Sequence, residues 1–149
     1  MLISIYGAKL KLDARYLLQM KTIEVVAAII EYNGKILCVQ RGPSKHDYVS
    51  EKWEFPGGKI EDNESAEEAI KREITEELHL EIIDSKFFTS VTHQYPDFNI
   101  KLDFFCCSIS NPNLVLTEHI NFVWLLPSEM DALDWAAADI PAVEKLAHA

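Results

Sequence analysis

The chain is short of basic residues, of cysteines and of long apolar runs. Lysine and arginine number 14 against 24 aspartates and glutamates, which gives a formal charge of -10. Such a surface repels the phosphate backbone of DNA or RNA. No stretch approaches the ~20 consecutive apolar residues that a membrane-spanning helix needs. We therefore expect neither a polymeric nucleic acid nor a membrane as a partner.

The three cysteines also exclude some classes of protein. Cys38, Cys106 and Cys107 are odd in number, and the adjacent pair would point to opposite faces of a strand, so a disulfide framework is not expected. Their spacing from histidines does not suggest a zinc site. The N-terminal segment scatters its charges and has no uninterrupted apolar core, so it does not read as a secretion signal. A reducing cytoplasm is the expected location.

The length of 149 residues and the 48% hydrophobic content are those of one globular domain that needs no disulfide or metal to fold. Met20 directly precedes the first strong strand pattern. We therefore expect residues 1–19 to be an N-terminal extension and residues 20–149 to form the domain. The alternative is that the first segment contributes an ordinary edge strand.

Alternating and β-branched patterns predict several strands. Residues 22–32 and 35–41 are separated by Asn33-Gly34, whose positive φ angles are typical of a two-residue hairpin turn. Further strands are expected at 80–92, 98–108 and 121–126, and helical segments at 128–133 and 140–146. This order predicts one α+β domain with helices packed on a mixed sheet.

One helix is predicted with its start and its buried face. Ser65 and Glu68 have the spacing of a capping box. Behind them, apolar residues recur at helical spacing at Ala66, Ala69, Ile70, Ile74 and Leu78. The helix should therefore span residues 66–78.

The same helix carries three glutamates on one face. Glu73, Glu76 and Glu77 lie at i, i+3 and i+4, so their carboxylates repel one another unless a cation lies between them. Magnesium prefers oxygen ligands and accepts a few carboxylates beside water and phosphate. Before the helix, Pro56-Gly57-Gly58 brings bare backbone close to it. If only the three glutamates are considered, the alternative to a magnesium site is a merely acidic surface helix.

The segment from Gly58 to Leu80 reads GKIEDNESAEEAIKREITEELHL. It resembles the Nudix box, G-x5-E-x7-R-E-U-x-E-E-x-G-U with U apolar. The departure is His79, where the family usually has glycine just past the helix end, so we expect that end to close differently. VVAAIIEYNGKILCVQR, KWEFPGGKIE and AAADIP are similar to the branch that hydrolyses nucleoside triphosphates, including oxidised-nucleotide sanitisers and cytidine-triphosphate pyrophosphohydrolases. The resemblance implies a Nudix-type α/β/α sandwich with the acidic helix packed on the sheet.

The resemblance also implies a catalytic and metal site. Magnesium, with manganese as a possible substitute, would be bound by Gly57 (through its carbonyl), Glu73, Glu76, Glu77 and Glu118. Arg72 would orient the glutamates. Glu73 and Glu118 are alternative general bases, and Glu118 could equally be a plain solvated loop residue.

The expected substrate contacts are Arg41, His46, Glu54, Phe55, Lys59 and Asp139. Arg41 could bind phosphate with its guanidinium fork or be an ordinary surface arginine. Phe55 could stack on a base or belong to the core. Asp139 resembles a base-reading position, and its alternative role is to cap the helix that begins at 140. An ionised Asp139 only accepts hydrogen bonds, which favours cytosine or adenine, but burial could let it donate as well.

The expected reaction is attack of water within a triphosphate, which releases a nucleoside monophosphate and pyrophosphate. Two alternatives remain. One is a Nudix hydrolase of dinucleotide polyphosphates or nucleotide sugars, branches that carry selectivity residues near Tyr95 and Pro96. The other is a non-catalytic nucleotide-sensing module. A nucleotide is the expected partner, and the chain could be a monomer or a homodimer.

Overall fold

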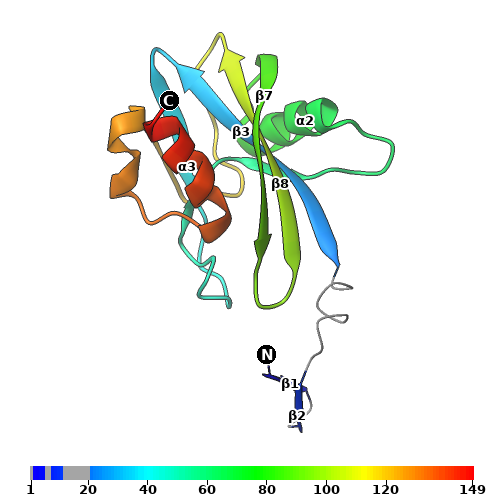
Figure 1. Ribbon diagram of the computed structural model, residues 1–149. Helices are drawn as coiled ribbons and strands as arrows, with labels where there is room; N and C mark the ends of the chain where they lie inside the picture. The colour runs from blue at the N-terminus through cyan, green and yellow to red at the C-terminus, as the bar shows by residue number, and fades with distance from the viewer. Residues whose placement is uncertain (1, 6–7, 12–20) are drawn as a thin grey trace.

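The computed structural model describes residues 2–5, 8–11 and 21–149, and the main domain is a mixed sheet with helices on both faces (Figure 1). The strands of the main sheet are β3 (Thr22–Tyr32), β4 (Lys35–Gln40), β5 (Trp53–Glu54), β6 (Gly57–Lys59), β7 (Ile82–Gln94), β8 (Asn99–Ile109) and β9 (Asn121–Leu125). The helical elements are α2 (Ala66–Leu78), the 3-10 turns η1 (Pro127–Ala132) and η2 (Ala137–Asp139), and α3 (Ile140–Ala147). The α+β prediction is confirmed.

Near the N-terminus, β1 (Leu2–Ile5) pairs antiparallel with β2 (Ala8–Lys11) in a two-stranded sheet of their own. The rest of the predicted extension, residues 1, 6–7 and 12–19, lies outside the described residues. The boundary at residue 20 therefore stays a prediction.

The main sheet is mixed because one central pair is parallel. Its strand order is β5-β4-β3-β8-β7, where β3 and β8 run parallel and the other neighbours are antiparallel. The short strand β6 pairs with β3 at Val25–Ala27, and β9 pairs with β4. The glycine segment is therefore fixed against the middle of the sheet. At the β3–β4 turn, Asn33 and Gly34 have φ angles of 52° and 78°, which confirms the predicted hairpin.

Helix α2 has the predicted bounds and the predicted cap. The Ser65 side chain accepts a hydrogen bond from the Glu68 backbone N–H, and the Glu68 carboxylate accepts one from the Ser65 N–H, each at 3.1 Å. Ala69, Ile70 and Ile74 are fully buried in a core on one face of the sheet. Burial of these side chains is the main force that holds the helix on the sheet.

The opposite face of the sheet carries a second core. Ala27 and Phe104 from the sheet pack there with Ala142 and Val143 of α3. Figure 1 shows α2 and α3 on opposite sides of the sheet, which confirms the α/β/α sandwich. The helical segment predicted at 128–133 is present as the 3-10 helix η1. Within the described ranges, no helix is long and apolar enough to cross a membrane.

The end of α2 corrects one prediction. His79 has φ 54° and ψ 33°, the left-handed conformation that glycine usually supplies, and its N–H donates to the Thr75 carbonyl at 3.1 Å. The expectation that this end would close differently is therefore wrong. His79 adopts this left-handed conformation although it has a β-carbon, which makes the left-handed region less favourable than it is for glycine.

Candidate active site

Two cavities meet beside β6. One is a polar cleft between β6, the second half of α2 and the loop before β9, and its acidic lining residues include Glu73, Glu77 and Glu118. The other is a largely apolar cavity of about 260 Å³ that Tyr95 and Asp139 line. Arg41, Glu54, Gly57, Gly58 and Lys59 line both cavities. A ligand with an apolar end and an anionic end could span the two.

The glycines of β6 allow the helix to approach the sheet. A β-carbon on Gly57 would overlap the backbone carbonyl of Val26 on the neighbouring strand. A β-carbon on Gly58 would overlap the carboxyl group of Glu73 from α2. No other residue type fits either position without movement of its neighbour. The predicted bare backbone is thus present, and it is in direct contact with a glutamate of the helix.

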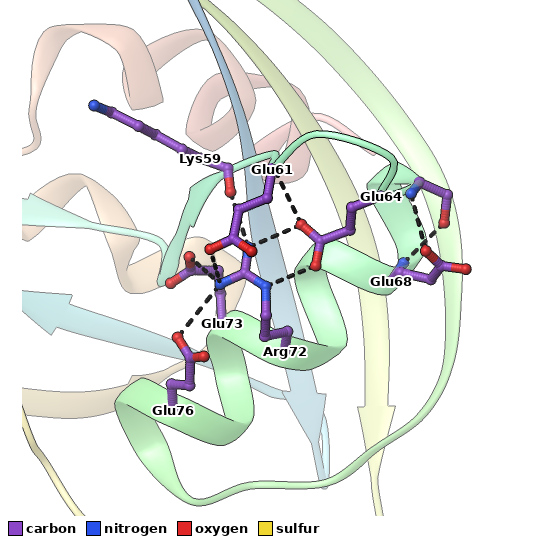
Figure 2. Close-up of polar contacts among 8 residues, drawn as sticks. Lys59, Glu61, Glu64, Glu68, Arg72, Glu73 and Glu76 are labelled. Carbon is purple, nitrogen blue, oxygen red and sulfur yellow. Dashed lines mark hydrogen bonds and ion pairs between the residues drawn. The ribbon is translucent and has the colours of Figure 1, made fainter.

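Arg72 forms the centre of an ion-pair network (Figure 2). Its Nε and Nη2 donate to the two carboxylate oxygens of Glu64 at 2.6 and 2.9 Å, and its Nη1 donates to Glu73 at 2.8 Å. Nη2 also donates to the Lys59 carbonyl at 3.0 Å. The hydrogen bonds from Arg72 lower the pKa of Glu64 to about 2. The network fixes the side chain of Glu73 at the edge of the cleft.

Glu77 is the buried acid of the cleft. Only 5% of the residue is exposed, and its Oε2 has no hydrogen-bond partner among the described residues. Burial, followed by the charges of Glu118, Glu73 and Glu54, raises its pKa to about 9. A buried carboxyl group surrounded by other carboxylates is unfavourable unless a cation balances it.

These residues fit a divalent cation, with one difference from the sequence-based set. The Glu76 side chain is 59% exposed, contacts Arg72 at 3.3 Å and does not line the cleft with Glu73 and Glu77. Among the described residues, no three acidic, histidine or cysteine side chains are grouped tightly enough to enclose an ion. Magnesium does not require such a cage, because it keeps several waters and uses phosphate oxygens of its substrate as ligands.

Glu54 lies where the two cavities meet, and two basic groups hold it. Arg41 Nε is 3.2 Å from one of its carboxylate oxygens, and His119 Nε2 is 3.4 Å from the other. The His119 side chain is 6% exposed, and its Nδ1 is buried with no hydrogen-bond partner among the residues described. No role for His119 follows from the sequence pattern, although it is next to Glu118 in a candidate loop.

The apolar cavity contains Asp139, which is 5% exposed. Its Oδ1 accepts a hydrogen bond from the Phe55 backbone N–H at 3.1 Å. It makes no side-chain capping bond to α3, so the alternative role as a helix cap is wrong. Burial, together with the charge of Glu54, raises the pKa of Asp139 well above its usual value. The protonated form of the Asp139 carboxyl is therefore favoured in this cavity.

The remaining candidates differ in how close they lie to the cavities. Phe55 is 3% exposed and packs against Phe104 and Trp135, so it belongs to the core as well as to the cavity wall. Lys59 lines both cavities, and Figure 2 shows its side chain directed away from the glutamates around Arg72. His46 is stacked on Tyr48 and lies outside the lining of both cavities. The structure therefore does not bring His46 to the site.

Comparisons with known proteins agree with this geometry. A "CTP pyrophosphohydrolase" of Escherichia coli K12 is 41% identical over 125 residues, which cover 84% of this chain and 91% of that protein. An "8-oxo-dGTP diphosphatase" of Proteus vulgaris is 36% identical over 86 residues, which cover 57% and 75%. The solution structure of the E. coli ORF135 protein aligns with a TM-score of 0.72 at 39% identity and covers 87% of this chain and 91% of that one.

The solution structure of MutT, a Nudix hydrolase from methicillin-resistant Staphylococcus aureus 252, aligns with a TM-score of 0.67 at 41% identity. It covers 86% of this chain and 97% of that one. The family model of the NUDIX domain matches residues 25–145, which include the polar cleft, the whole of α2 and all residues of the apolar cavity except Ile23. The chain therefore belongs to the Nudix hydrolase family.

Proposed function

We propose that this chain hydrolyses a nucleoside triphosphate to a nucleoside monophosphate and pyrophosphate with the help of magnesium. The observation that carries the proposal is the pair of adjoining cavities. The apolar cavity of about 260 Å³ has room for one base, and the acidic cleft beside it suits a metal-bound phosphate chain. The names of the E. coli and Proteus vulgaris relatives support the same substrate class.

Glu73, Glu77 and Glu118 would hold magnesium or manganese, together with the Gly57 carbonyl. When bound, the ion would neutralise phosphate charge and lower the pKa of a coordinated water. Glu76 would join these ligands only by leaving its contact with Arg72. Arg72 keeps the Glu73 carboxylate in one place, so Glu73 is a candidate to accept the proton of the attacking water. Glu118, which also lines the cleft, is the other candidate.

Arg41 and Lys59 would supply positive charge to the phosphates, since both line the two cavities. Glu54 would position Arg41 through their ion pair. Asp139 would contact the base from inside the apolar cavity. In its protonated form it donates one hydrogen bond and accepts others, whereas in its ionised form it only accepts. The base preference of the enzyme therefore depends on which form the bound nucleotide selects.

The proposal is tested by measuring pyrophosphate release with magnesium across a panel of ordinary and oxidised nucleoside triphosphates, with Glu77→Gln as the blank. We expect turnover of at least one triphosphate and none by the variant. Turnover only of dinucleotide polyphosphates or nucleotide sugars, whose cleavage does not yield pyrophosphate, would contradict the substrate class. Nucleotide binding without any hydrolysis would favour a sensing module instead.

We also propose a reducing compartment such as the cytoplasm. All three cysteines are free, and burial raises the pKa of Cys38 and of Cys107 to about 12, so these two thiols stay protonated and unreactive. The acidic net charge argues against a polymeric nucleic acid as a partner. Size-exclusion chromatography with light scattering would distinguish a monomer from a homodimer.

A further inference from the structure

Tyr95 is a buried tyrosine whose polar end lies at the apolar cavity. It follows β7 directly, is 5% exposed and lines the cavity together with Asp139. Its hydroxyl oxygen accepts a hydrogen bond from the backbone N–H of Ala138 at 3.2 Å. Asp139 is the next residue, and after burial its charge contributes to the raised pKa of Tyr95, so the two side chains lie near each other in the same cavity.

The hydroxyl proton of Tyr95 has no acceptor among residues 21–149. A phenol has one proton to donate besides its lone pairs, and a buried donor that is left unused lowers stability. Burial raises the pKa of Tyr95, so this proton is retained at neutral pH. The unused donor therefore indicates a ligand that supplies an acceptor.

Contacts around the ring fix the direction of the hydroxyl. Tyr95 stacks on Tyr48 with ring centroids 5.2 Å apart, and His93 and Phe98 contact it at centroid distances of 4.5 and 5.3 Å. Tyr48 is itself held, because its hydroxyl donates to Asp97 Oδ2 at 2.6 Å. A donor that is already oriented loses little entropy when a ligand binds.

We propose that Tyr95 is a specificity-determining residue that donates a hydrogen bond to a ring nitrogen or carbonyl oxygen of the base. The inference rests on the proposed function, because it assumes that the base occupies the apolar cavity. Tyr95 and Asp139 would then read neighbouring atoms on one edge of the base. A base without an acceptor at the atom facing Tyr95 would bind more weakly.

The test compares Tyr95→Phe with the control variant Tyr32→Phe. The control also removes one hydroxyl, but from a half-buried tyrosine that packs against Trp124. We would measure KM and kcat for each triphosphate, and the Kd of the corresponding monophosphate without metal. For the preferred base, Tyr95→Phe should raise KM and Kd about 10-fold, with kcat nearly unchanged. Ribose 5-phosphate, which has no base, should bind both variants and the wild type equally.

A second measurement changes the ligand and leaves the protein unchanged. In the wild type, base analogues that each lack one acceptor atom should include one that binds about 10-fold more weakly. Equal binding of all analogues would overturn the inference, as would unchanged monophosphate binding by Tyr95→Phe. An equal loss of ribose 5-phosphate binding would also overturn it. If the wild type releases pyrophosphate from no triphosphate, the proposed function itself fails.

Discussion

The carboxyl group of Glu73 occupies the space that a β-carbon on Gly58 would need. The neighbouring Gly57 faces the backbone carbonyl of Val26 in the same way. A side chain at these two positions would therefore meet different obstacles. At Gly58 the obstacle is the end of one side chain, the Glu73 carboxylate, whereas at Gly57 it is the backbone of a paired strand.

Gly58→Ala should displace Glu73 from Arg72 and lower pyrophosphate release at least about 10-fold, while the free energy of unfolding falls less than in Gly57→Ala, because only one side chain has to move. Gly57→Ala should instead lower the free energy of unfolding by about 3 kcal/mol or more, because β6 must separate from β3. Urea unfolding and steady-state kinetics on both variants check this. Full activity of Gly58→Ala would contradict the assigned position of Glu73.

Glu77→Gln should remove the response of thermal stability to magnesium. The wild type should gain several degrees in Tm at saturating magnesium, because binding to the folded state stabilises it. The variant should gain almost none. Without metal it should be at least as stable as the wild type at pH 7 to 8, because the buried carboxyl group is gone.

Glu76→Gln is the matched control for this experiment, because Glu76 is exposed and lies outside the cleft. It should retain most of the magnesium response. An equal loss in both variants would mean that Glu76 turns into the cleft when the metal binds. Differential scanning calorimetry with and without a chelator measures the difference directly.

Glu64 should stabilise the fold only above acidic pH. Its pKa in the folded protein is about 2, below the usual value of 4.5, because Arg72 donates hydrogen bonds to its ionised form. The stabilisation is therefore fully present above about pH 5 and is lost as the pH falls toward 2. The gap in the free energy of unfolding between wild type and Glu64→Gln should narrow over that range in urea titrations. A gap independent of pH would contradict this role of the ion pair.

Elements that are specified by sequence patterns a few residues long were predicted correctly. The capping box and the apolar spacing gave both ends of α2, and Asn33-Gly34 gave the hairpin. Strand ends were less accurate, since β7 ends at Gln94 rather than at residue 92. The turn at 127–132 adopts a 3-10 conformation, which apolar spacing alone does not distinguish from an α-helix.

Contacts between distant segments were harder to predict. Helix geometry predicts that Glu73, Glu76 and Glu77 share one face. It does not predict that the Glu76 side chain contacts Arg72, because that depends on side-chain contacts. His119 approaches Glu54 only because β9 pairs with β4, and Tyr95 meets Ala138 only through the packing of η2. Such pairings depend on the tertiary fold and leave no spacing pattern in the sequence.

His79→Gly should stabilise the protein. His79 holds a left-handed conformation that is less favourable for residues with a β-carbon than for glycine. The substitution should raise the free energy of unfolding by about 1 kcal/mol, or Tm by roughly 3 °C for a chain of this size. His79→Ala, which keeps the β-carbon, is the control and should give no such gain. A loss of stability in His79→Gly would mean that the imidazole makes a compensating contact.

Asp139 should have separable effects on stability and on selectivity. Asp139→Ala leaves the buried N–H of Phe55 without an acceptor, which costs about 1 to 3 kcal/mol of stability. Asp139→Asn keeps an acceptor oxygen and should lose much less. Both variants should change the ratio of kcat/KM between bases with and without an exocyclic amine. An unchanged ratio in Asp139→Asn would exclude contact with the base.

Apart from the five residues that they share, the two cavities are lined by different stretches of the chain. The acidic cleft depends on β6 and α2, whereas Tyr95 and Asp139, the polar groups at the apolar cavity, come from the segment after β7 and from η2. Substitutions can therefore accumulate around the second cavity while the acidic helix stays intact. During divergence, such a scaffold can acquire a new preferred ligand without passing through an inactive intermediate.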